Sequence, residues 1–322
     1  MKKTVFALVF GFSLCFPSSS GAQKVYRIGV LVASDLFVPA FDGFKKKMAE
    51  LGYAEAKNVK YDFHNAKGDS ETIKKLAQKL VQDKPDLIAT VSTSVTLPVA
   101  RLTKGSNLPV LFLSASDPLR FVKSYASSGN NLTGISNSSL DLIEKRMDLL
   151  KELVPEIKRL IVLEVPSGTN YEASHRLIWE AGKKLGLDLT SVQAVGVEEI
   201  KGKISILITR KLGEAVFTPP DILITAAIEE IARQAIREGL PLIGTNVQTV
   251  KKGALAVYTA EYFEMGQQGA VMANKILKGA KPADLPIELP KKLKLVINLR
   301  TAKAIGLKIP REILLRADEV IE

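Results

Sequence analysis

The chain has 322 residues, of which 46% are hydrophobic and 25% charged, so it can fold into more than one domain with a hydrophobic core. This composition excludes a disordered chain and a fibre. The formal net charge is +11, but the basic residues are spread along the chain without interleaved aromatic residues or a nucleic-acid-binding module. We therefore expect a solvated basic surface and no nucleic-acid partner.

Residues 1–22 have the pattern of a secretory signal peptide. The basic pair Lys2-Lys3 precedes an apolar run at 4–16, and small residues follow at 18–22. The apolar run is short for a membrane anchor. We expect cleavage near Ala22-Gln23 and export to the periplasm.

The only cysteine of the chain, Cys15, lies inside this predicted signal. It could accept a lipid in a bacterial lipoprotein, but such signals carry a small residue where this chain has Leu14. Lipid anchoring is therefore the less favoured alternative. The exported protein is expected to contain no cysteine, which fits an oxidising compartment without a disulfide framework.

Strand and helix patterns alternate through the first third of the chain. Runs rich in β-branched, aliphatic and aromatic residues predict strands at 25–32, 59–63, 87–91 and 110–113. Apolar residues at helical spacing predict helices between them, for example at 70–83. Short connections in such a β-α-β series predict a parallel, doubly wound sheet.

The same alternation restarts at residue 140, with no close sequence repeat between the two series. Further strands are predicted at 159–163, 187–195, 215–217, 242–244, 254–258 and 293–299. The chain is therefore predicted to be an α/β protein with two doubly wound parallel-sheet lobes.

A three-segment hinge is predicted to join the lobes. The Gly/Asn-rich stretch within 129–136 is interpreted as the first crossing. The strand at 293–299 needs neighbouring strands, so the chain is expected to return to the first lobe and then to finish on the second. The predicted division is a signal peptide at 1–22, lobe 1 at 23–130 plus 250–280, and lobe 2 at 131–249 plus 281–322.

Polar residues follow nearly every predicted strand. In parallel sheets, ligands bind beyond the carboxyl ends of the strands, where helix N-termini present free amides. Each polar residue alone is compatible with an ordinary helix cap, but together on two facing edges they predict a polar cleft. Two aromatic residues at strand ends are candidates for an apolar wall. The candidate ligand-binding residues are Ser34, Asp35, Phe37, Thr93, Ser94, Ser114, Ser116, Asp117, Asn170, Thr218, Asp221, Thr245 and Tyr258.

Catalytic motifs are absent from the sequence. It contains no Gly-x-x-x-x-Gly-Lys-Ser/Thr phosphate loop, no His-Glu-x-x-His and no Gly-x-Ser-x-Gly. Only two histidines occur, His64 and His175, and neither has an evident partner for metal binding or nucleophilic catalysis. An exported hydrolase is disfavoured because it lacks a general base. We expect no enzyme activity, no metal and no cofactor.

The chain resembles the periplasmic substrate-binding proteins of ABC importers, of the tryptophan/tyrosine type, over about residues 26–309. The resemblance rests on short segments in a shared order: IGVL at 28–31, LGY at 51–53, NAKGD at 65–69, SDP at 116–118, NLTGIS at 131–136 and KGAKP at 278–282. It implies the type I bilobal binding-protein fold, capture of a small solute between the lobes and delivery to a membrane permease.

The resemblance also implies roles for particular residues. In members that take aromatic amino acids, Ser/Thr hydroxyls and helix N-termini hold the carboxylate, and acidic residues hold the ammonium group. The matching positions are Thr93, Ser94, Ser116, Asp117, Asn170 and Asp221. Two positions depart from the family pattern: Ile222 replaces a residue that is often polar, and Val247 one that is commonly acidic.

We therefore expect an exported, monomeric solute-binding protein of an ABC importer. It would close on an amino acid or a related compound by a hinge motion and deliver it to a permease. The alternative is a periplasmic sensor that reports its ligand to a membrane receptor, because a permease and a receptor would both recognise the closed form of the lobes.

Overall fold

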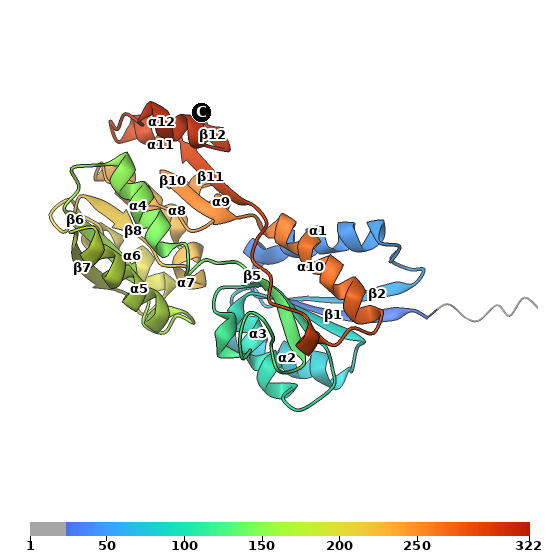
Figure 1. Cartoon of the computed structure of the whole chain (residues 1–322). Helices are drawn as coiled ribbons and strands as arrows, with labels where there is room; N and C mark the ends of the chain where they lie inside the picture. Colours follow the sequence, from blue (N-terminus) through green and yellow to red (C-terminus); the bar gives the residue numbers. More distant parts are fainter. Residues whose placement is uncertain (1–23) are drawn as a thin grey trace, which may run out of the picture.

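The computed structural model describes residues 24–322. The predicted signal peptide and Cys15 lie outside the described residues. Within 24–322, no helix is both long enough and apolar enough to cross a membrane. The chain forms two α/β lobes, each built around its own sheet, and several segments run between them (Figure 1). The prediction of two α/β lobes is confirmed.

Lobe 1 contains a five-stranded sheet in which all neighbouring strands are parallel. In order across the sheet, the strands are β2 (Val59–Asn65), β1 (Tyr26–Val32), β3 (Leu87–Val91), β4 (Val110–Ala115) and β5 (Leu132–Ser136). This order reverses direction between β1 and β3, which is where doubly wound sheets bind ligands.

The interpretation of 130–136 as a hinge crossing is wrong for β5. This strand pairs in parallel with β4, from Val110 opposite Leu132 to Ala115 opposite Ser136. Its five residues are all buried. The preceding Gly129-Asn130 turn resembles a linker in sequence, but it only reverses the chain at the start of this edge strand. The first crossing therefore lies after Ser136.

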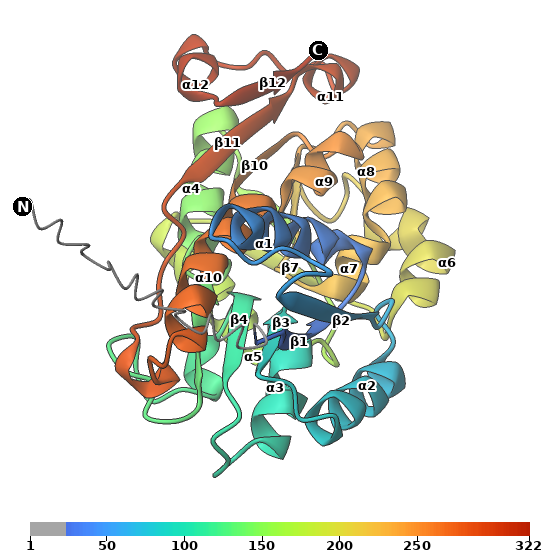
Figure 2. The same cartoon turned by 90° about the vertical axis from the view of Figure 1, so that its right-hand side faces the viewer.

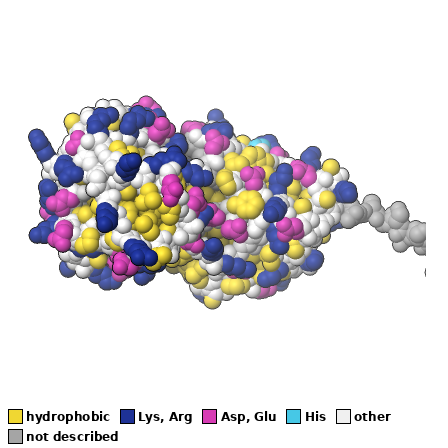
Figure 3. Space-filling model, turned by 90° about the horizontal axis from the view of Figure 1, so that it is seen from above, with side chains coloured by type: hydrophobic (Ala, Val, Ile, Leu, Met, Phe, Trp, Pro, Cys, Tyr) yellow, Lys and Arg dark blue, Asp and Glu magenta, His cyan; other side chains and the backbone are white. Residues whose placement is uncertain are grey.

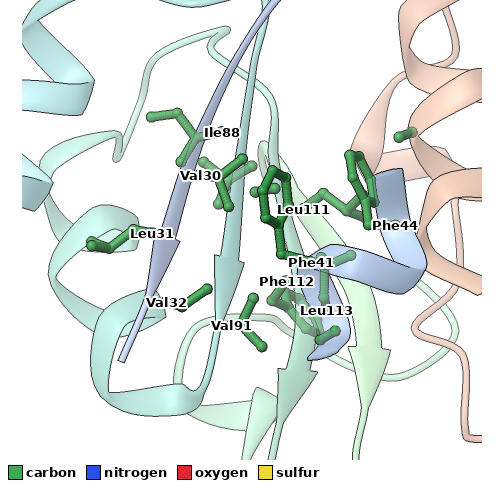
Figure 4. Close-up of a cluster of buried hydrophobic side chains, with 14 of the residues drawn as sticks. Val30, Leu31, Val32, Phe41, Phe44, Ile88, Val91, Leu111, Phe112 and Leu113 are labelled. Atoms are coloured by element: carbon green, nitrogen blue, oxygen red, sulfur yellow. The ribbon is translucent and has the colours of Figure 1, made fainter. Parts of the chain in front are cut away.

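Helices cover both faces of the lobe 1 sheet. Helices α1 (Val38–Glu50) and α10 (Tyr262–Leu277) lie side by side on one face, and α2 (Ser70–Gln82) and α3 (Thr93–Leu102) lie on the other (Figure 1). Every residue of β3 and β4 is buried between these layers. This double coverage explains why both strands read as continuous apolar runs. Figure 4 shows part of this core, where side chains of β1, β3 and β4 meet Phe41 and Phe44 of α1.

Lobe 2 contains a seven-stranded mixed sheet. In order, its strands are β12 (Glu319–Ile321), β11 (Leu293–Asn298), β10 (Ala256–Ala260), β9 (Leu242–Ile243), β8 (Ala215–Phe217), β6 (Arg159–Glu164) and β7 (Asp188–Gln193). The strands from β7 to β10 are parallel, whereas β11 runs antiparallel to β10. Figure 2 shows β11 rising beside β10 to the C-terminal elements, which include α11 (Leu299–Ala304) and α12 (Arg311–Arg316).

Alternating residues of β6 enter two separate cores, as the period of two in a strand requires. Leu160 and Val162 pack in the cluster that contains residues of α4 (Ile143–Leu153) and α5 (Tyr171–Lys184). Ile161 and Leu163 pack in the cluster that contains residues of α6 (Val197–Leu207) and α8 (Ile228–Arg237). Helices therefore cover both faces of this sheet as well.

The predicted assignment of 250–280 to lobe 1 is wrong for its first part. Strand β10 pairs with β9 and β11 in the lobe 2 sheet, and only α10 returns to lobe 1. The segment after α10 also stays with lobe 1, because the amide of Ser136 donates to the carbonyl of Glu288 (2.9 Å) and the amide of Glu288 donates to the carbonyl of Gly134 (3.0 Å).

The chain thus passes between the two sheets three times: after β5, between β10 and α10, and before β11. We propose a revised division in which lobe 1 comprises 24–136 and 262–288, and lobe 2 comprises 140–260 and 293–322. On the face seen in Figure 3, Lys and Arg side chains are scattered over both lobes with Asp and Glu between them. Among the described residues many of these charges form exposed ion pairs, for example Lys184 with Glu144 (2.6 Å).

Candidate functional site

A cavity of about 50 Å³ lies between the two lobes at the carboxyl ends of their strands. It has room for a few water molecules only, so a larger ligand requires the lobes or side chains to move. Seven predicted residues line it: Phe37, Thr93, Ser94, Ser116, Asn170, Asp221 and Thr245. The other lining residues are Leu36, Ser92, Asn137, Ser139, Thr169, Pro220, Ile222, Thr225, Asn246 and Tyr262.

Hydroxyl groups from two strand ends form the lobe 1 wall. Thr93 begins α3, and its Oγ1 accepts from the amide of Ser116 (2.9 Å) and lies 3.0 Å from Ser116 Oγ. Ser92 precedes α3, and its Oγ accepts from the amide of Ser94 (3.3 Å). These bonds hold the loops after β3 and β4 together, so the hydroxyls have fixed positions beside the N-terminus of a ten-residue helix.

Asn137 adds an amide to this wall, directly after β5. Its Nδ2 donates to Ser114 Oγ (3.0 Å), and its Oδ1 accepts from the amide of Ser139 (2.9 Å). Ser114 is fully buried, so this predicted site residue supports Asn137 from behind and does not line the cavity. Asn137 follows a strand, as the predicted site residues do, but the interpretation of 130–136 as a hinge crossing leaves it out of the predicted site.

Lobe 2 contributes a carboxylate without a cationic partner. One oxygen of Asp221, Oδ1, accepts from the amides of Leu223 (2.7 Å) and Ile224 (3.1 Å) and so caps α7 (Ile222–Ala226). Burial raises the pKa of Asp221, and the two amide hydrogen bonds only partly oppose this shift. Within 24–322 its second oxygen, Oδ2, receives no hydrogen bond and Asp221 forms no ion pair, so it can accept a donor from a ligand.

Asn170 lies beside Asp221 on the same wall. Its Nδ2 donates to the carbonyl of Pro220 (3.1 Å), while its Oδ1 is buried and has no donor among the described residues. A buried oxygen without a donor is unfavourable, and a ligand N–H group would relieve that cost. Asn170 and Asp221 together therefore form an acceptor pair that fits an ammonium group.

Aromatic and aliphatic side chains form the rest of the cavity wall. Phe37 packs edge-to-face on Tyr262, with ring centroids 5.1 Å apart. Tyr262 begins α10, just after the second crossing, and no local sequence pattern indicates that this helix start reaches the cavity. Ile222 of lobe 2 packs against the hydrophobic core of lobe 1. The apolar contact between the lobes is therefore part of the site.

A buried cation lies behind the lobe 2 wall. Arg146 of α4 is only 1% exposed and donates to the carbonyls of Tyr258 (2.9 Å), Ser139 (2.9 Å) and Thr245 (3.2 Å). Burial lowers its pKa to about 10, so the guanidinium remains charged at neutral pH. Ser139 and Thr245 line the cavity, whereas Arg146 does not.

Four other predicted residues, Ser34, Asp35, Thr218 and Tyr258, do not line the cavity. Asp35 is exposed and pairs with Lys67 (2.6 Å), next to Ser34. Thr218 is buried, and its Oγ1 donates to the carbonyl of Ile243 (3.5 Å). Tyr258 packs against the hydrophobic core of lobe 2, and its carbonyl accepts from Arg146. Strand ends alone therefore do not determine which side chains face the cavity.

Asp117 lies at the lip of the cleft beside a contact between the lobes. Arg120, three residues later, donates from Nη1 to the carbonyl of Thr169 in lobe 2 (2.6 Å). Burial raises the pKa of Asp117, and the charges of Arg120 and Arg176 oppose the shift. Asp117 is therefore placed to interact with basic groups of both lobes at this lip.

Comparison with known proteins supplies independent information. A family model described as ABC transporter substrate binding protein matches residues 27–321. A tyrosine-binding protein of Clostridioides difficile (strain R20291) is 28% identical over 293 residues, which cover 90% of this chain and 83% of that protein.

Two solved structures are similar over 92% of the chain at 26% identity each. A Streptococcus pneumonia ABC domain in complex with L-Trp has a TM-score of 0.83, with all of that chain covered. A ligand-free, open structure of a substrate-binding protein with adhesive properties from Clostridium difficile has a TM-score of 0.69, with 99% of that chain covered. At the same sequence identity, this chain therefore superimposes better on the structure with bound L-Trp than on the ligand-free, open structure.

Proposed function

Because the chain belongs to the family of ABC transporter substrate-binding proteins, we propose that it captures an aromatic amino acid, or a close analogue, between its lobes. The observation that carries this proposal is the composition of the interlobe cavity. Asp221 and Asn170 offer acceptors for an ammonium group, hydroxyls offer donors for a carboxylate, and Phe37 with Tyr262 offers an aromatic surface.

The ligands of two relatives support this choice of solute. One relative is described as tyrosine-binding and another was solved with L-Trp. Ile222 is compatible with such a ligand because it adds an apolar contact to the cavity wall. Val247 begins α9 (Val247–Lys251) and is not among the cavity-lining residues, so its lack of charge does not weaken the site.

Members of this family act outside the cytoplasm and serve transport. For this chain we propose a periplasmic monomer that delivers its solute to a membrane permease and does not convert it. The two histidines support binding without turnover. His175 pairs with the buried Glu164 (2.9 Å) and His64 with Asp62 (3.0 Å), and none of these residues lines the cavity.

The test is a binding screen on protein stripped of bound ligand by unfolding and refolding. L-Tryptophan, L-tyrosine and L-phenylalanine should each raise the unfolding temperature, and ligand at a hundredfold excess over Kd adds about 2.7 kcal/mol of stability. Isothermal titration calorimetry should give one site per chain. Glucose and arabinose serve as controls. If sugars bind and all three amino acids fail, the proposed solute class is wrong.

A further inference from the structure

Arg146 is a buried charge that the protein itself does not neutralise. It takes part in no ion pair within 24–322, and the first 23 residues contain no Asp or Glu. Its hydrogen-bond partners are three carbonyls and, at 3.4 Å, the hydroxyl of Ser139. Burying an unpaired charge is costly unless an anion offsets it, and carbonyl dipoles supply only part of that compensation.

Two of the residues that Arg146 contacts, Ser139 and Thr245, line the cavity, so Arg146 lies behind that part of its wall. Its guanidinium donates hydrogen bonds to the carbonyls of Thr245 after β9, Tyr258 in β10 and Ser139 on the first crossing. Asp221 follows β8, which lies on the other side of β9 in the sheet. An unpaired positive charge therefore lies behind the β9–β10 end of the lobe 2 wall, and an unpaired negative charge lies in that wall after β8.

Such a pair of charges gives a zwitterion a preferred orientation. The ammonium group is attracted to Asp221 and Asn170, and the carboxylate is attracted toward Ser139 and Thr245, which separate Arg146 from the cavity. Ser139 and Thr245 contact Arg146 and also line the cavity, and the protein interior screens charges less than water does, so the charge of Arg146 acts on a ligand at these residues.

We propose that Arg146 is a positioning residue that draws the carboxylate of the ligand to the Ser139–Thr245 end of the cavity, and so selects α-amino acids over their uncharged derivatives. This proposal rests on the proposed function, because it assigns an orientation to that solute. An arginine suits the role because its planar guanidinium can donate hydrogen bonds to three carbonyls at once while it keeps its charge.

The experiment compares L-tryptophan with L-tryptophanamide, which keeps the ammonium group and the indole but lacks the carboxylate charge. Dissociation constants are measured by calorimetry for the natural chain, Arg146→Gln and Arg146→Lys. The natural chain should prefer the acid at least tenfold. Arg146→Gln should reduce that preference about tenfold because it removes the positive charge, and Arg146→Lys should retain most of the preference because it keeps that charge.

Two controls separate an electrostatic role from a structural one. Arg233→Gln removes an exposed charge on α8, which pairs with Glu229, and should leave the preference unchanged. If Arg146→Gln weakens the acid and the amide by the same factor, Arg146 only supports the fold of the wall and the proposal is wrong.

The natural chain alone also tests the proposal, should Arg146→Gln fail to fold. Equal affinity for L-tryptophan, L-tryptophanamide and tryptamine would overturn the role of Arg146 while leaving aromatic binding intact. Failure of every aromatic amino acid to bind would instead overturn the proposed function, and the orientation with it.

Discussion

Ser92 has a backbone conformation that residues other than glycine rarely adopt, with φ +105° and ψ 146°. Such a conformation costs about 1–3 kcal/mol and persists only when its surroundings enforce it. Here the amide of Ser92 donates to the carbonyl of Ser114 (2.9 Å), and its carbonyl accepts from Thr96 Oγ1 (2.8 Å). These two hydrogen bonds therefore hold the turn that brings the Ser92 and Ser94 hydroxyls to the cavity.

Asp221 should contribute to stability and to binding with opposite signs. Burial raises the folded-state pKa of Asp221 above the ordinary 3.8, so ionisation of Asp221 destabilises the folded protein. The stability that the protonated carboxyl contributes is fully present below pH 3.8 and is lost as pH rises through the folded pKa. Asp221→Asn retains a capping side chain and removes the charge. We expect the ligand-free unfolding temperature at pH 7 to rise by about 2–4 °C.

The same substitution should weaken binding of L-tryptophan tenfold to a hundredfold, because it removes the charged acceptor of the ammonium group. For the natural chain, affinity should fall on acidification through the raised pKa of Asp221, and Asp221→Asn should lack this dependence. Calorimetry at pH 7 and pH 4.5 measures both. Asp69→Asn, at the exposed N-cap of α2, is the matched control and should leave affinity unchanged. A similar pH dependence in both variants would assign the titration to another group.

The contact between α1 and α10 depends on two glycines. A Cβ added at Gly266 would lie 1.8 Å from the carbonyl oxygen of Ala40, and one at Gly43 would lie 2.0 Å from that of Phe263. These atoms belong to backbone, so neither clash can be relieved by rotating a side chain. The close approach holds α10 on lobe 1 between two of the three crossings.

We therefore predict that Gly266→Ala destabilises the protein by about 1–3 kcal/mol or more, as overpacking does. Gly202 is the matched control, because it lies within α6 and a Cβ there would meet nothing within 4 Å. Gly202→Ala should stabilise the protein by up to about 1 kcal/mol, because alanine is the better helix former. Urea unfolding measures both, and a Gly266→Ala variant as stable as the natural chain would contradict the tight packing.

Local patterns predicted most elements but not their partners. The apolar runs of β3 and β4 and the helical spacing of α2 are visible in sequence because burial on a fixed face imposes them. The neighbours of β10 cannot be predicted in this way, because the residue pattern of a strand does not determine which sheet the strand joins. The sequence does not distinguish the buried Arg146 from the lysines near it in α4. The Gly129-Asn130 turn resembles a linker, so the strand β5 that follows it was not predicted.

The two lobes share one strand order, although their sequences show no close repeat. The order β2-β1-β3-β4-β5 in lobe 1 is matched by β7-β6-β8-β9-β10 in lobe 2, to which β11 and β12 are added. In each lobe the fifth strand leads directly into a crossing. This correspondence explains why both β5 and β10 were misplaced: each is the last strand of its parallel series and lies next to the hinge.

Closure of the two lobes should depend in part on Arg120, whose guanidinium reaches the Thr169 carbonyl across the cleft lip. Removing it with Arg120→Ala takes away a contact that exists only when the lobes are close, so the equilibrium should shift toward the open form. Because a partly exposed hydrogen bond contributes about 0.5–1.5 kcal/mol, affinity for L-tryptophan should fall about two- to tenfold.

Small-angle X-ray scattering should show a larger radius of gyration for ligand-free Arg120→Ala than for the natural chain, and saturating ligand should remove the difference. Arg101→Ala is the matched control, because Arg101 is an exposed arginine of lobe 1 in α3 that forms no hydrogen bond or ion pair to lobe 2 within 24–322. It should change neither the radius nor the affinity. If Arg120→Ala also leaves both unchanged, the contact with Thr169 follows closure without stabilising it, and the interlobe packing of Ile222 becomes the stronger candidate for holding the lobes together.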